Sequence, residues 1–451
     1  MLTAPGKPSL LLLLVAWLVG CAGSAACGSP PSDDRRGEPI FNGRDLSGWK
    51  GLVRDPIARS KMSPETLAAE QRKADELVRA HWRVENGEII NDGHGPHLCT
   101  ERHYRDFELW LDWKISPGAD SGIYLRGSPQ VQIWDTIHGI EPAKVGSGGL
   151  YNNQKHRSTP LVKADRPAGE WNAFHIRMIG ERVTVTLNGQ LVVDDVPMEN
   201  YWDRSRPIFV SEQIELQTHG GEIRFRDIRL REIGADEANE YLRTRDADGF
   251  TPLFNGADLT GWIGSTSGYF VQDGVLICDP ATGGTLLTSD EYADFTLRFE
   301  FRLPPGGNNG LALRAPATGN PAYEGMEIQI LDDTHEKYAN LLPWQYHGSV
   351  YGLVPAHRGY LRPVGEWNFE EVTLKGSRLT VVLNGTVIVE HDLAAITEPM
   401  DGQPHPGLSR RSGHLGFMGH GDRVEFRNIL IRPIAPDAAD EVKGDDADGA
   451  P

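Results

Sequence analysis

The stretch Gln130-Val131-Gln132-Ile133-Trp134-Asp135-Thr136-Ile137-His138 returns later in the chain as Glu327-Ile328-Gln329-Ile330-Leu331-Asp332-Asp333-Thr334-His335. Apolar and polar residues alternate in both copies, as in a β-strand, whose successive side chains point to opposite faces of a sheet. Val131 and Ile133 then lie on one face, and the two glutamines lie on the other. Half burial alone would explain one such strand. Because both copies keep an amide, an acid and an imidazole, we interpret the polar face as the floor of a binding site.

The repetition extends over most of the chain. Segment 39–49 matches 252–262, and both contain Phe-Asn-Gly-x-Asp-Leu-x-Gly-Trp. Further matches follow in the same order: 121–126 with 309–314, 169–172 with 365–368, 187–189 with 383–385, and 219–228 with 420–429. We therefore expect two domains, 38–233 and 250–434, joined by a linker, 234–249, with a short helix at 236–244. The acidic tail, 435–451, is expected to be disordered.

Short strands with glycine-rich turns fill each repeat. Segment 107–115 alternates regularly, and 182–188 and 190–194 flank an Asn-Gly turn, which is typical of a β-hairpin. This pattern predicts an all-β fold, a two-sheet sandwich or jelly roll in each repeat. One insertion, 51–81, occurs in the first repeat only. Its Ser-Pro-Glu start predicts a helix at 64–80 beside the first sandwich.

Charge and cysteine content narrow the function classes. The chain has 451 residues and a formal net charge of −18, which argues against nucleic-acid binding, since that requires clustered Lys and Arg. The four cysteines are Cys21, Cys27, Cys99 and Cys278. Cys99 and Cys278 fall at non-equivalent positions of the two repeats. They predict neither a disulfide within a domain nor a cysteine-based metal site.

The N-terminus has the pattern of an export signal. Lys7 precedes an apolar run, 10–19, that is too short to span a bilayer. The run ends in Leu-Val-Gly-Cys, which resembles a bacterial lipobox and implies lipidation of Cys21; a plain secretory signal cleaved near Ala26 is the alternative. We expect a lipoprotein signal peptide at 1–21 and a flexible tether at 22–37. The protein would then work in the cell envelope, in the periplasm or on the outer surface, with a lipid anchor as its only membrane contact.

A set of polar residues recurs in both repeats and forms the candidate site. The pairs are Arg126 and Arg314, Gln130 and Glu327, Gln132 and Gln329, Asp135 and Asp332, His138 and His335, Tyr151 and Tyr351, and His219 and His420. Taken singly, each has an ordinary explanation, such as a surface ion pair, a structural histidine or a core aromatic residue. Together they indicate one site. Trp134, on the glutamine face of the first repeat only, is a candidate for stacking on a sugar ring.

These motifs resemble the 3-keto-disaccharide hydrolase domain family. The matching marks are Phe-Asn-Gly-x-Asp-Leu-x-Gly-Trp, Ser-Gly-Ile-Tyr-Leu-Arg, Gln-Ile-x-Asp, Gly-Glu-Trp-Asn, Leu-Asn-Gly and Leu-Gln-x-His-Gly. The resemblance implies two tandem concanavalin-like jelly-roll sandwiches and glycoside substrates oxidised to a ketone at C3 by a separate oxidoreductase. The second repeat departs from the pattern: Leu331 replaces Trp134, and Gly-Phe-Met-Gly at 416–419 replaces Glu-Leu-Gln-Thr at 215–218. It is expected to be a binding or degenerate copy.

The C3 ketone suggests a mechanism for these residues. It acidifies the C2 hydrogen, so that a base can remove this proton, the C1 substituent can leave by β-elimination, and water can then add. We expect Asp135 or His138 as the base, Arg126 as the stabiliser of the enolate, and His219 as the acid. A divalent metal held by His and Asp is an alternative to Arg126. Gln130, Gln132, Trp134 and Tyr151 would bind the sugar.

Two other functions fit the same strands. The first is a non-catalytic, lectin-like pair of carbohydrate-binding sandwiches. The second is a glycosidase with two carboxylates at a defined separation. The first repeat has Gln130 where the second has Glu327, so its strand lacks a partner for Asp135. This absence weakens the glycosidase hypothesis.

Overall fold

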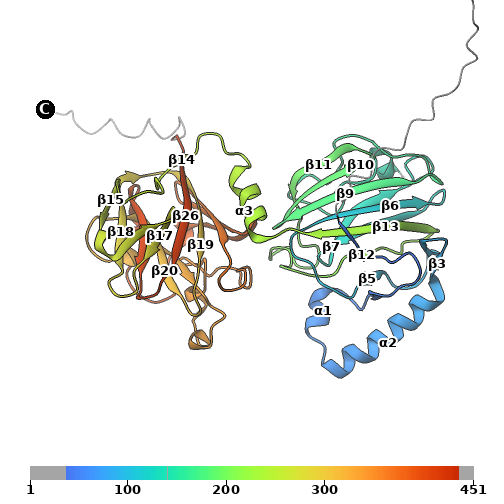
Figure 1. The fold of residues 1–451 in the computed structure, drawn as a ribbon, viewed down its shortest axis with the longest axis horizontal. Helices are drawn as coiled ribbons and strands as arrows, with labels where there is room; N and C mark the ends of the chain where they lie inside the picture. The colour runs from blue at the N-terminus through green and yellow to red at the C-terminus, as the bar shows by residue number, and fades with distance from the viewer. Residues whose placement is uncertain (1–36, 140, 436–451) are drawn as a thin grey trace, which may run out of the picture. The chain divides into compact units, whose positions relative to one another are not determined.

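The structure is a computed structural model that describes residues 37–139 and 141–435. It contains two β-sandwiches in tandem, each made of a large and a small antiparallel sheet (Figure 1). Mostly β structure in two sandwiches was the fold class predicted from the sequence. The expected signal peptide, the lipidated Cys21 and nearly all of the tether and of the tail lie outside the described residues.

In the first sandwich, both α-helices lie in the predicted insertion. The elements of this sandwich are β1 (Glu38–Pro39), β2 (Trp49–Gly51), α1 (Pro56–Ser60), α2 (Pro64–His81), β3 (Trp82–Glu85), β4 (Glu88–Asn91), β5 (Leu98–Thr100), β6 (Phe107–Ile115), β7 (Asp120–Leu125), β8 (Ser128–Trp134), η1 (Glu141–Val145), β9 (Asn172–Ile179), β10 (Arg182–Leu187), β11 (Gln190–Pro197), β12 (Glu215–Leu216) and β13 (Ile223–Glu232).

The two sheets of the first sandwich face each other across one hydrophobic core. The large sheet has the order β11-β10-β9-β6-β13-β4-β3, with β1 paired to β13, and the small sheet has the order β2-β5-β12-β7-β8. Ile123, Val131, Ile133 and Leu216 of the small sheet are buried in the core cluster. Because side chains alternate along a strand, the residues between them point away from the core. We call this opposite side of the small sheet the site face.

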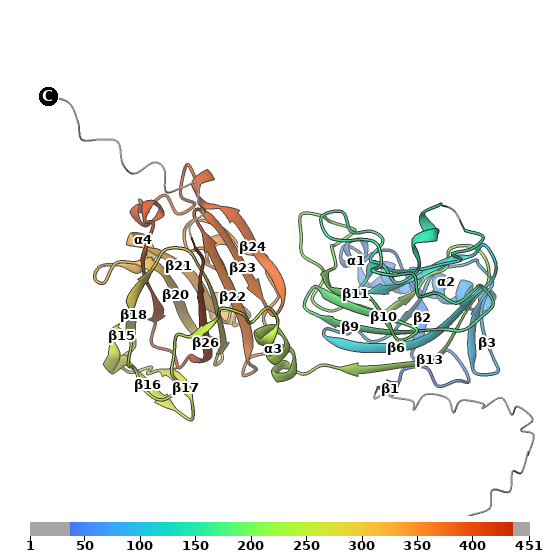
Figure 2. The ribbon, with the colours of Figure 1, turned by 90° about the horizontal axis from the view of Figure 1, so that it is seen from above.

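The insertion docks on the edge strand β2. Ser63 caps α2 by accepting a hydrogen bond from the Thr66 backbone N–H, and the helix starts at Pro64, as the sequence predicts. Asp75 accepts from the Gly51 backbone N–H at 3.0 Å, and the Gln71 amide donates to the Gly51 carbonyl at 2.8 Å. The helix side chains thus satisfy backbone groups that an edge strand leaves unpaired. Figure 2 shows α2 and β2 from a second direction.

The Asn-Gly hairpins are confirmed in both repeats. Strands β10 and β11 meet at Asn188 and Gly189, whose φ angles are 51° and 80°, as a type I′ turn requires. The second repeat has the same pair of angles at Asn384 and Gly385.

A helix precedes the second sandwich, within the predicted linker. The elements from this helix onward are α3 (Ala235–Thr244), β14 (Thr251–Pro252), β15 (Trp262–Gly264), η2 (Thr266–Gly268), β16 (Tyr269–Gln272), β17 (Val275–Cys278), β18 (Gly284–Tyr292), β19 (Phe295–Arg302), β20 (Asn308–Ala315), α4 (Pro321–Glu324), β21 (Met326–Leu331), η3 (Glu336–Tyr338), η4 (Pro343–Gln345), β22 (Asn368–Lys375), β23 (Arg378–Leu383), β24 (Thr386–Asp392), η5 (Leu393–Ala395), η6 (Pro406–Ser409), β25 (Gly413–Gly419) and β26 (Glu425–Pro433). The small sheet of the second sandwich has the strand order β15-β18-β25-β20-β21. This order corresponds to β2-β5-β12-β7-β8 in the first sandwich.

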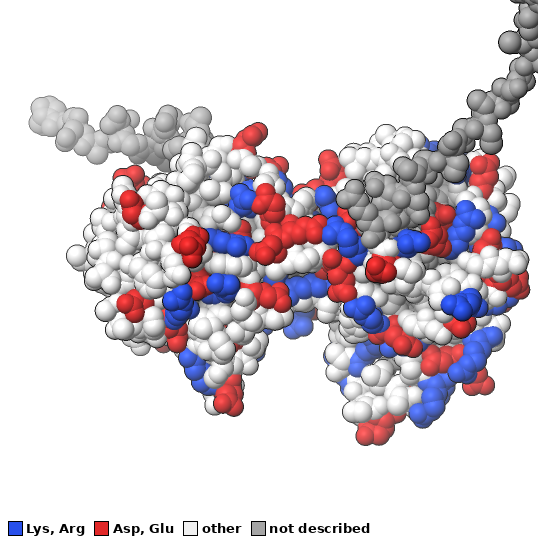
Figure 3. Space-filling view, in the orientation of Figure 1, with Lys and Arg blue, Asp and Glu red and all other residues white. Residues whose placement is uncertain are grey.

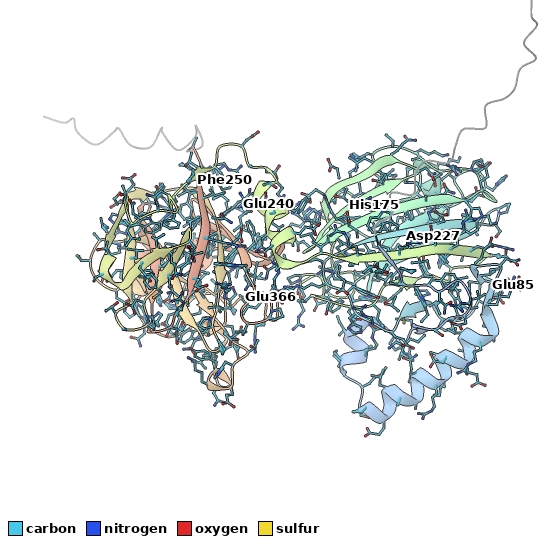
Figure 4. All side chains as sticks on the ribbon, viewed as in Figure 1. Glu85, His175, Asp227, Glu240, Phe250 and Glu366 are labelled. Atoms are coloured by element: carbon cyan, nitrogen blue, oxygen red, sulfur yellow. The ribbon has the colours of Figure 1, made fainter. Side chains whose placement is uncertain are left out.

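The outer face of the first large sheet is a charged scaffold surface. Arg231 contacts Glu108 at 2.7 Å, and the ring of His175 stacks on Trp110 with centroids 4.8 Å apart. Figure 3 shows acidic and basic side chains interspersed on the visible faces, and Figure 4 labels His175 on β9. The candidate site residues do not belong to this surface. Among the described residues, no helix combines the length and apolarity needed to cross a bilayer.

Candidate functional site

The site face of the first sandwich carries polar side chains in register across three strands. Glu215 of β12 lies opposite Tyr124 of β7, and Gly122 of β7 lies opposite Gln132 of β8. The backbone N–H of Gln217 donates to the Gly122 carbonyl at 3.0 Å. The regular pairing of short antiparallel strands therefore brings residues that lie far apart in the sequence into neighbouring rows.

A chain of hydrogen bonds links these rows. The Gln130 amide donates to the side-chain oxygen of Gln132, and the Gln132 amide donates to Oδ1 of Asp120 at 2.6 Å. Nδ1 of His219 lies 3.1 Å from Oδ2 of the same carboxylate. Asp120 thus joins the predicted residues Gln130, Gln132 and His219 into one network, although it was not among the predicted site residues.

The network sets the tautomer of His219. A carboxylate only accepts hydrogen bonds, so Nδ1 of His219 carries the proton that faces Asp120. Nε2 is then the unprotonated nitrogen of the neutral ring, and the side chain is 62% exposed. Burial raises the pKa of Asp120, and the opposing contributions of His219 and Gln132 favour its charged form. A histidine held in this way is a base that is open to a ligand.

Glu215 supplies a second, different acid–base group on the site face. Its side chain is 1% exposed, and burial raises its pKa to about 8, against a small opposing effect of Arg59 on α1. At neutral pH this carboxyl is therefore protonated and acts as a hydrogen-bond donor. Its Oε2 atom has no hydrogen-bond partner among the described residues.

Tyr124, the register partner of Glu215, contacts an amide and a second aromatic ring. The Gln217 amide donates to the Tyr124 hydroxyl at 3.3 Å, and the rings of Tyr124 and His97 meet edge to face at 5.2 Å. Burial, aided by His219, lowers the pKa of His97 to about 4. Its Nδ1 accepts from the Thr218 backbone N–H at 3.1 Å, so its other nitrogen carries the proton. This part of the site face is neutral at pH 7 and rich in donors.

Gly122 leaves the centre of the site face free of a projecting side chain. A Cβ atom at this position would lie 3.1 Å from side-chain atoms of both Gln130 and Gln217. Any larger residue would push these two amides apart. The glycine therefore lets two strands contribute amides to the same point.

Trp134 and Tyr151 form an aromatic pair at one side of the site. Their ring centroids are 5.0 Å apart with planes at 77°. Together with Gln132 and Gly149 they line a cavity of about 140 Å³. Trp134 is 6% exposed, so little of its ring is open for a sugar to stack on.

Arg126 does not belong to this site. It lies in the turn after β7, is 2% exposed, and donates to the Val210 carbonyl at 2.9 Å and toward the Met178 sulfur. Arg314 is buried in the same way and contacts Asp294 at 2.9 Å. Both guanidinium groups donate to backbone carbonyls, that of Val210 for Arg126 and that of Ala293, among others, for Arg314. The expected role of Arg126 as enolate stabiliser therefore does not fit its position.

Asp135 and His138 are also separate from the site. The Asp135 carboxylate accepts from the backbone N–H groups of Gly118, Ile137 and His138, and these bonds, together with His138, lower its pKa to about 2 despite burial. Strand alternation places Asp135 on the face opposite to Trp134. The pair holds the turn that follows β8, which corrects its expected role as the base.

Asp332 has the same structural function in the second repeat, and His335 also has a structural one. Asp332 accepts from the Gly306 backbone N–H at 2.7 Å, and His335 caps a short helix by accepting from the Lys337 backbone N–H. The recurrence of these acids and imidazoles thus reflects a shared turn.

The remaining residues of the second repeat do come together. Glu327, Gln329, Tyr351 and His420 line one cavity of about 390 Å³. No cluster of three or more His, Cys, Asp or Glu side chains suited to a metal ion occurs among residues 37–139 and 141–435.

Five residues of the site were not predicted from the sequence: Asp120, Glu215, Gln217, His97 and Tyr124. A usable signal existed for the first three, since Glu215, Gln217 and His219 share one face of an alternating segment and Asp120 directly precedes a recurring motif. His97 precedes a strand of three residues, which is too short to show a pattern.

Comparisons with known proteins identify the family of both repeats. The model of a family described as "3-keto-alpha-glucoside-1,2-lyase-like domain" matches residues 37–231 and 249–432. A 3-keto-disaccharide hydrolase of Bacteroides thetaiotaomicron is 25% identical over 244 residues, which cover 45% of this chain and 84% of that protein.

Two solved structures come from Parabacteroides distasonis proteins assigned as glycosyl hydrolases. One is 31% identical, covers 41% of this chain and 99% of its own, and has a TM-score of 0.38. The other is 27% identical, covers 42% and 96%, and has a TM-score of 0.37.

Proposed function

Because the chain belongs to the 3-keto-alpha-glucoside-1,2-lyase-like family, we propose that its first sandwich cleaves glycosides that carry a ketone at C3. Family membership supports a glycoside-acting, hydrolase-like enzyme. The 3-keto specificity and the order of steps are our proposal. The observation that carries it is the network in which Asp120 orients His219 on the site face.

His219 is placed to act as both base and acid. The C2–H bond breaks, its proton goes to Nε2 of His219, and the electrons are delocalised onto the C3 oxygen as an enolate. The enolate then collapses to a C1=C2 double bond, the C1–O bond breaks, and the departing oxygen takes the proton back from Nε2. Because C1 and C2 are adjacent, one imidazole reaches both atoms, and no second acid is required. Water then adds across C1=C2, with hydroxyl at C1 and hydrogen at C2.

The neighbouring donors suit the negative charge that develops on the C3 oxygen. Gln130 and Gln217 each use one amide hydrogen in a bond within the site, and every carboxamide nitrogen carries two hydrogens. The neutral carboxyl of Glu215 adds an O–H donor farther along the face. Donors buried in this way stabilise an oxyanion more strongly than donors in water.

The spacing of the acids disfavours a two-carboxylate glycosidase. Asp120 lies four residues before Tyr124, the register partner of Glu215. With about 3.3 Å per residue and about 4.8 Å between strands, the two acidic Cα atoms are about 14 Å apart. Glycosidases of this class need roughly 5 to 10 Å between their carboxyl groups. Side chains on Cα atoms this far apart reach that separation only by turning toward each other, whereas Asp120 is held by Gln132 and His219. A lectin-like role for the first sandwich would leave the oriented His219 without a function.

Matched substrates test the proposal. The full chain should release nitrophenol from the 3-keto form of nitrophenyl glucoside and leave the unoxidised glucoside intact. In D2O, the C2 hydrogen of the ketone should exchange in the presence of the protein, and His219→Ala should abolish both exchange and release. His138→Ala is the control and should retain both. Turnover of the unoxidised glucoside, or full activity of His219→Ala, would contradict the mechanism.

The cellular setting also stays a proposal. We propose that Cys21 is lipidated, that the mature protein acts in the cell envelope, and that a separate oxidoreductase forms the ketone. The support is the signal pattern at 7–21 and the chemistry of the substrate.

A further inference from the structure

The second sandwich has an arrangement of amide, carboxylate and imidazole like that around Gln132, but it is made by partly different residues. Gln329 donates to Asn308 Oδ1 at 2.7 Å, as Gln132 donates to Asp120 at 2.6 Å. The carboxylate has moved to the neighbouring strand: His420 faces Glu327, with Nε2 3.7 Å from Oε1. An imidazole beside a carboxylate and an amide is therefore present in both sandwiches.

The second sandwich also has a tryptophan–tyrosine pair, although its tryptophan comes from a different segment. Leu331 occupies the position of Trp134, yet Tyr351 still meets a tryptophan, Trp344, which comes from η4. The centroids are 4.9 Å apart with planes at 84°, close to the arrangement of the first pair. Two different sequence solutions thus hold a tyrosine in the same way.

The polar residues around Glu215 have no counterpart in the second sandwich. Gly416 stands where the first repeat has Glu215, Ala312 where it has Tyr124, and Met418 where it has Gln217. Ala312 and Met418 join an apolar cluster with Ala322 of α4, a helix in the β20–β21 connection that the first sandwich replaces with a tight turn. Apolar packing therefore fills the space of the neutral acid.

The imidazole is turned the wrong way for the proposed chemistry. In the first site Nδ1 of His219 faces the carboxylate, which leaves Nε2 as a free base. In the second site Nε2 of His420 faces Glu327, and this interaction raises the pKa of the ring. The nitrogen that would remove a proton is thus engaged with a carboxylate.

The cavity still has the features of a ligand site. Its volume is about 390 Å³, and its lining includes Tyr323, Tyr338 and Tyr351 beside the amides of Gln329 and Gln345. Glu327 is 4% exposed, and the 3.7 Å approach of His420 Nε2 to its Oε1 atom is longer than a hydrogen bond, so among the described residues this oxygen keeps a free acceptor position. A buried acceptor of this kind requires a donor, which a sugar hydroxyl supplies.

We infer that the second sandwich is a separate, non-catalytic binding site for a neutral pyranose sugar. Amides and the Glu327 carboxylate bind its hydroxyls, and the tyrosines cover its apolar ring faces. This site would hold glycoside chains near the enzyme whether or not they carry a ketone. The inference goes beyond the proposed function and does not depend on it.

Binding and turnover test the inference separately. The full chain is titrated calorimetrically with trehalose, sucrose, maltose, cellobiose and lactose, all neutral and unoxidised. At least one should bind, and Gln329→Ala should weaken that binding at least tenfold. Gln272→Ala, which removes an exposed glutamine from β16, is the matched control and should bind like the wild type. Tyr323→Ala, at a half-buried position, gives a second variant if Gln329→Ala does not fold.

The outcomes are distinct. If none of the five sugars binds, or if binding is unchanged in both Gln329→Ala and Tyr323→Ala, the inferred site is overturned. If a His219→Ala chain retains turnover of a 3-keto glucoside that His420→Ala then removes, the second site is catalytic and the inference is overturned. If the wild type binds a sugar through Gln329 but turns over no ketone, the proposed function fails and the second site stands.

Discussion

At the scale of single residues, the candidate activity depends on which nitrogen of His219 is free. Asp120 decides this, because its carboxylate accepts the Nδ1 proton and leaves Nε2 as the base. The same sandwich holds Glu215 in the opposite protonation state, because burial favours its neutral form. Two carboxyl groups of one sheet therefore differ in protonation because their surroundings differ.

Asp120→Asn should lower kcat on a 3-keto glucoside about 10³-fold, within the range of general acid–base effects. The amide can donate to Nδ1, which moves the ring proton to Nε2 and removes the base. Nitrogen NMR of the labelled ring should show the changed tautomer, while KM changes little. An unchanged kcat with the altered tautomer would show that His219 is not the base.

Glu215→Gln should alter the pH dependence of stability. The pKa of Glu215 rises from 4.5 in the unfolded chain to about 8 in the folded one. The folded state therefore binds this proton more tightly, so the contribution is fully present below pH 4.5 and is lost as the pH rises through 8. A tenfold change in proton affinity corresponds to about 1.4 kcal/mol, so the free energy of unfolding should fall by a few kcal/mol.

Melting curves check this prediction. The Gln variant should melt near the wild-type temperature at pH 5 and above it at pH 9, since glutamine does not ionise. A constant difference between the two proteins across this range would contradict a buried, protonated Glu215.

At the scale of elements, the helical insertion contacts the small sheet most closely where α2 meets Gly51 of β2. A Cβ atom at Gly51 would lie 2.6 Å from backbone atoms of Ala74, so α2 packs directly on the backbone of β2. The insertion also contains α1, whose Arg59 contacts Glu212 at 2.9 Å, just before β12. Docking of the insertion thus supports the strand that carries Glu215.

Gly51→Ala should destabilise the first sandwich by several kcal/mol, because the helix must move away and its bonds to Gly51 must break. Gly234→Ala is the control, since a Cβ atom there meets nothing within 4 Å. Urea denaturation followed by tryptophan fluorescence measures both variants. Equal stability of the two would mean that the insertion is not packed on β2.

At the scale of the whole molecule, the described residues form two large hydrophobic cores and two small clusters. One large core contains residues of the first repeat and the other contains residues of the second. The fold is the same in both, while the site faces differ in their acids. One copy can therefore change its site without losing its core.

Two large cores predict two unfolding transitions, because the cluster that contains residues of both repeats, Ile179, Ile233, Ala238, Leu242 and Phe369, is small. In calorimetry of the full chain, Gly51→Ala should lower the temperature of one transition by several degrees and leave the other in place. A single transition that shifts as a whole would show that the cores unfold together.

Much of the fold was predictable from local patterns. Alternation along 130–134 identified both the strand and its polar face, and Ser63 with Pro64 located the start of α2. The Asn-Gly pairs located the hairpins. These features depend on neighbours in the sequence, which is why a sequence read alone reveals them.

Repetition was a weaker guide to the site. Arg126, Asp135 and His138 recur because both sandwiches need the same turns and anchors. Asp120 and Glu215 have no acid at the equivalent positions of the second repeat, which has Asn308 and Gly416 there. Residues shared by the two repeats are therefore mostly structural, and the acids of the candidate site are not shared.

The amino-acid sequence by itself determined the strands, their polar faces and the division into two repeats, because backbone periodicity and turn geometry are local. Only the tertiary structure decided which acid meets which imidazole. That choice depends on strand order: β12 lies beside β7, and β7 beside β8, so residues about a hundred positions apart become neighbours. No local pattern encodes such a contact, since the sheet forms it from distant segments.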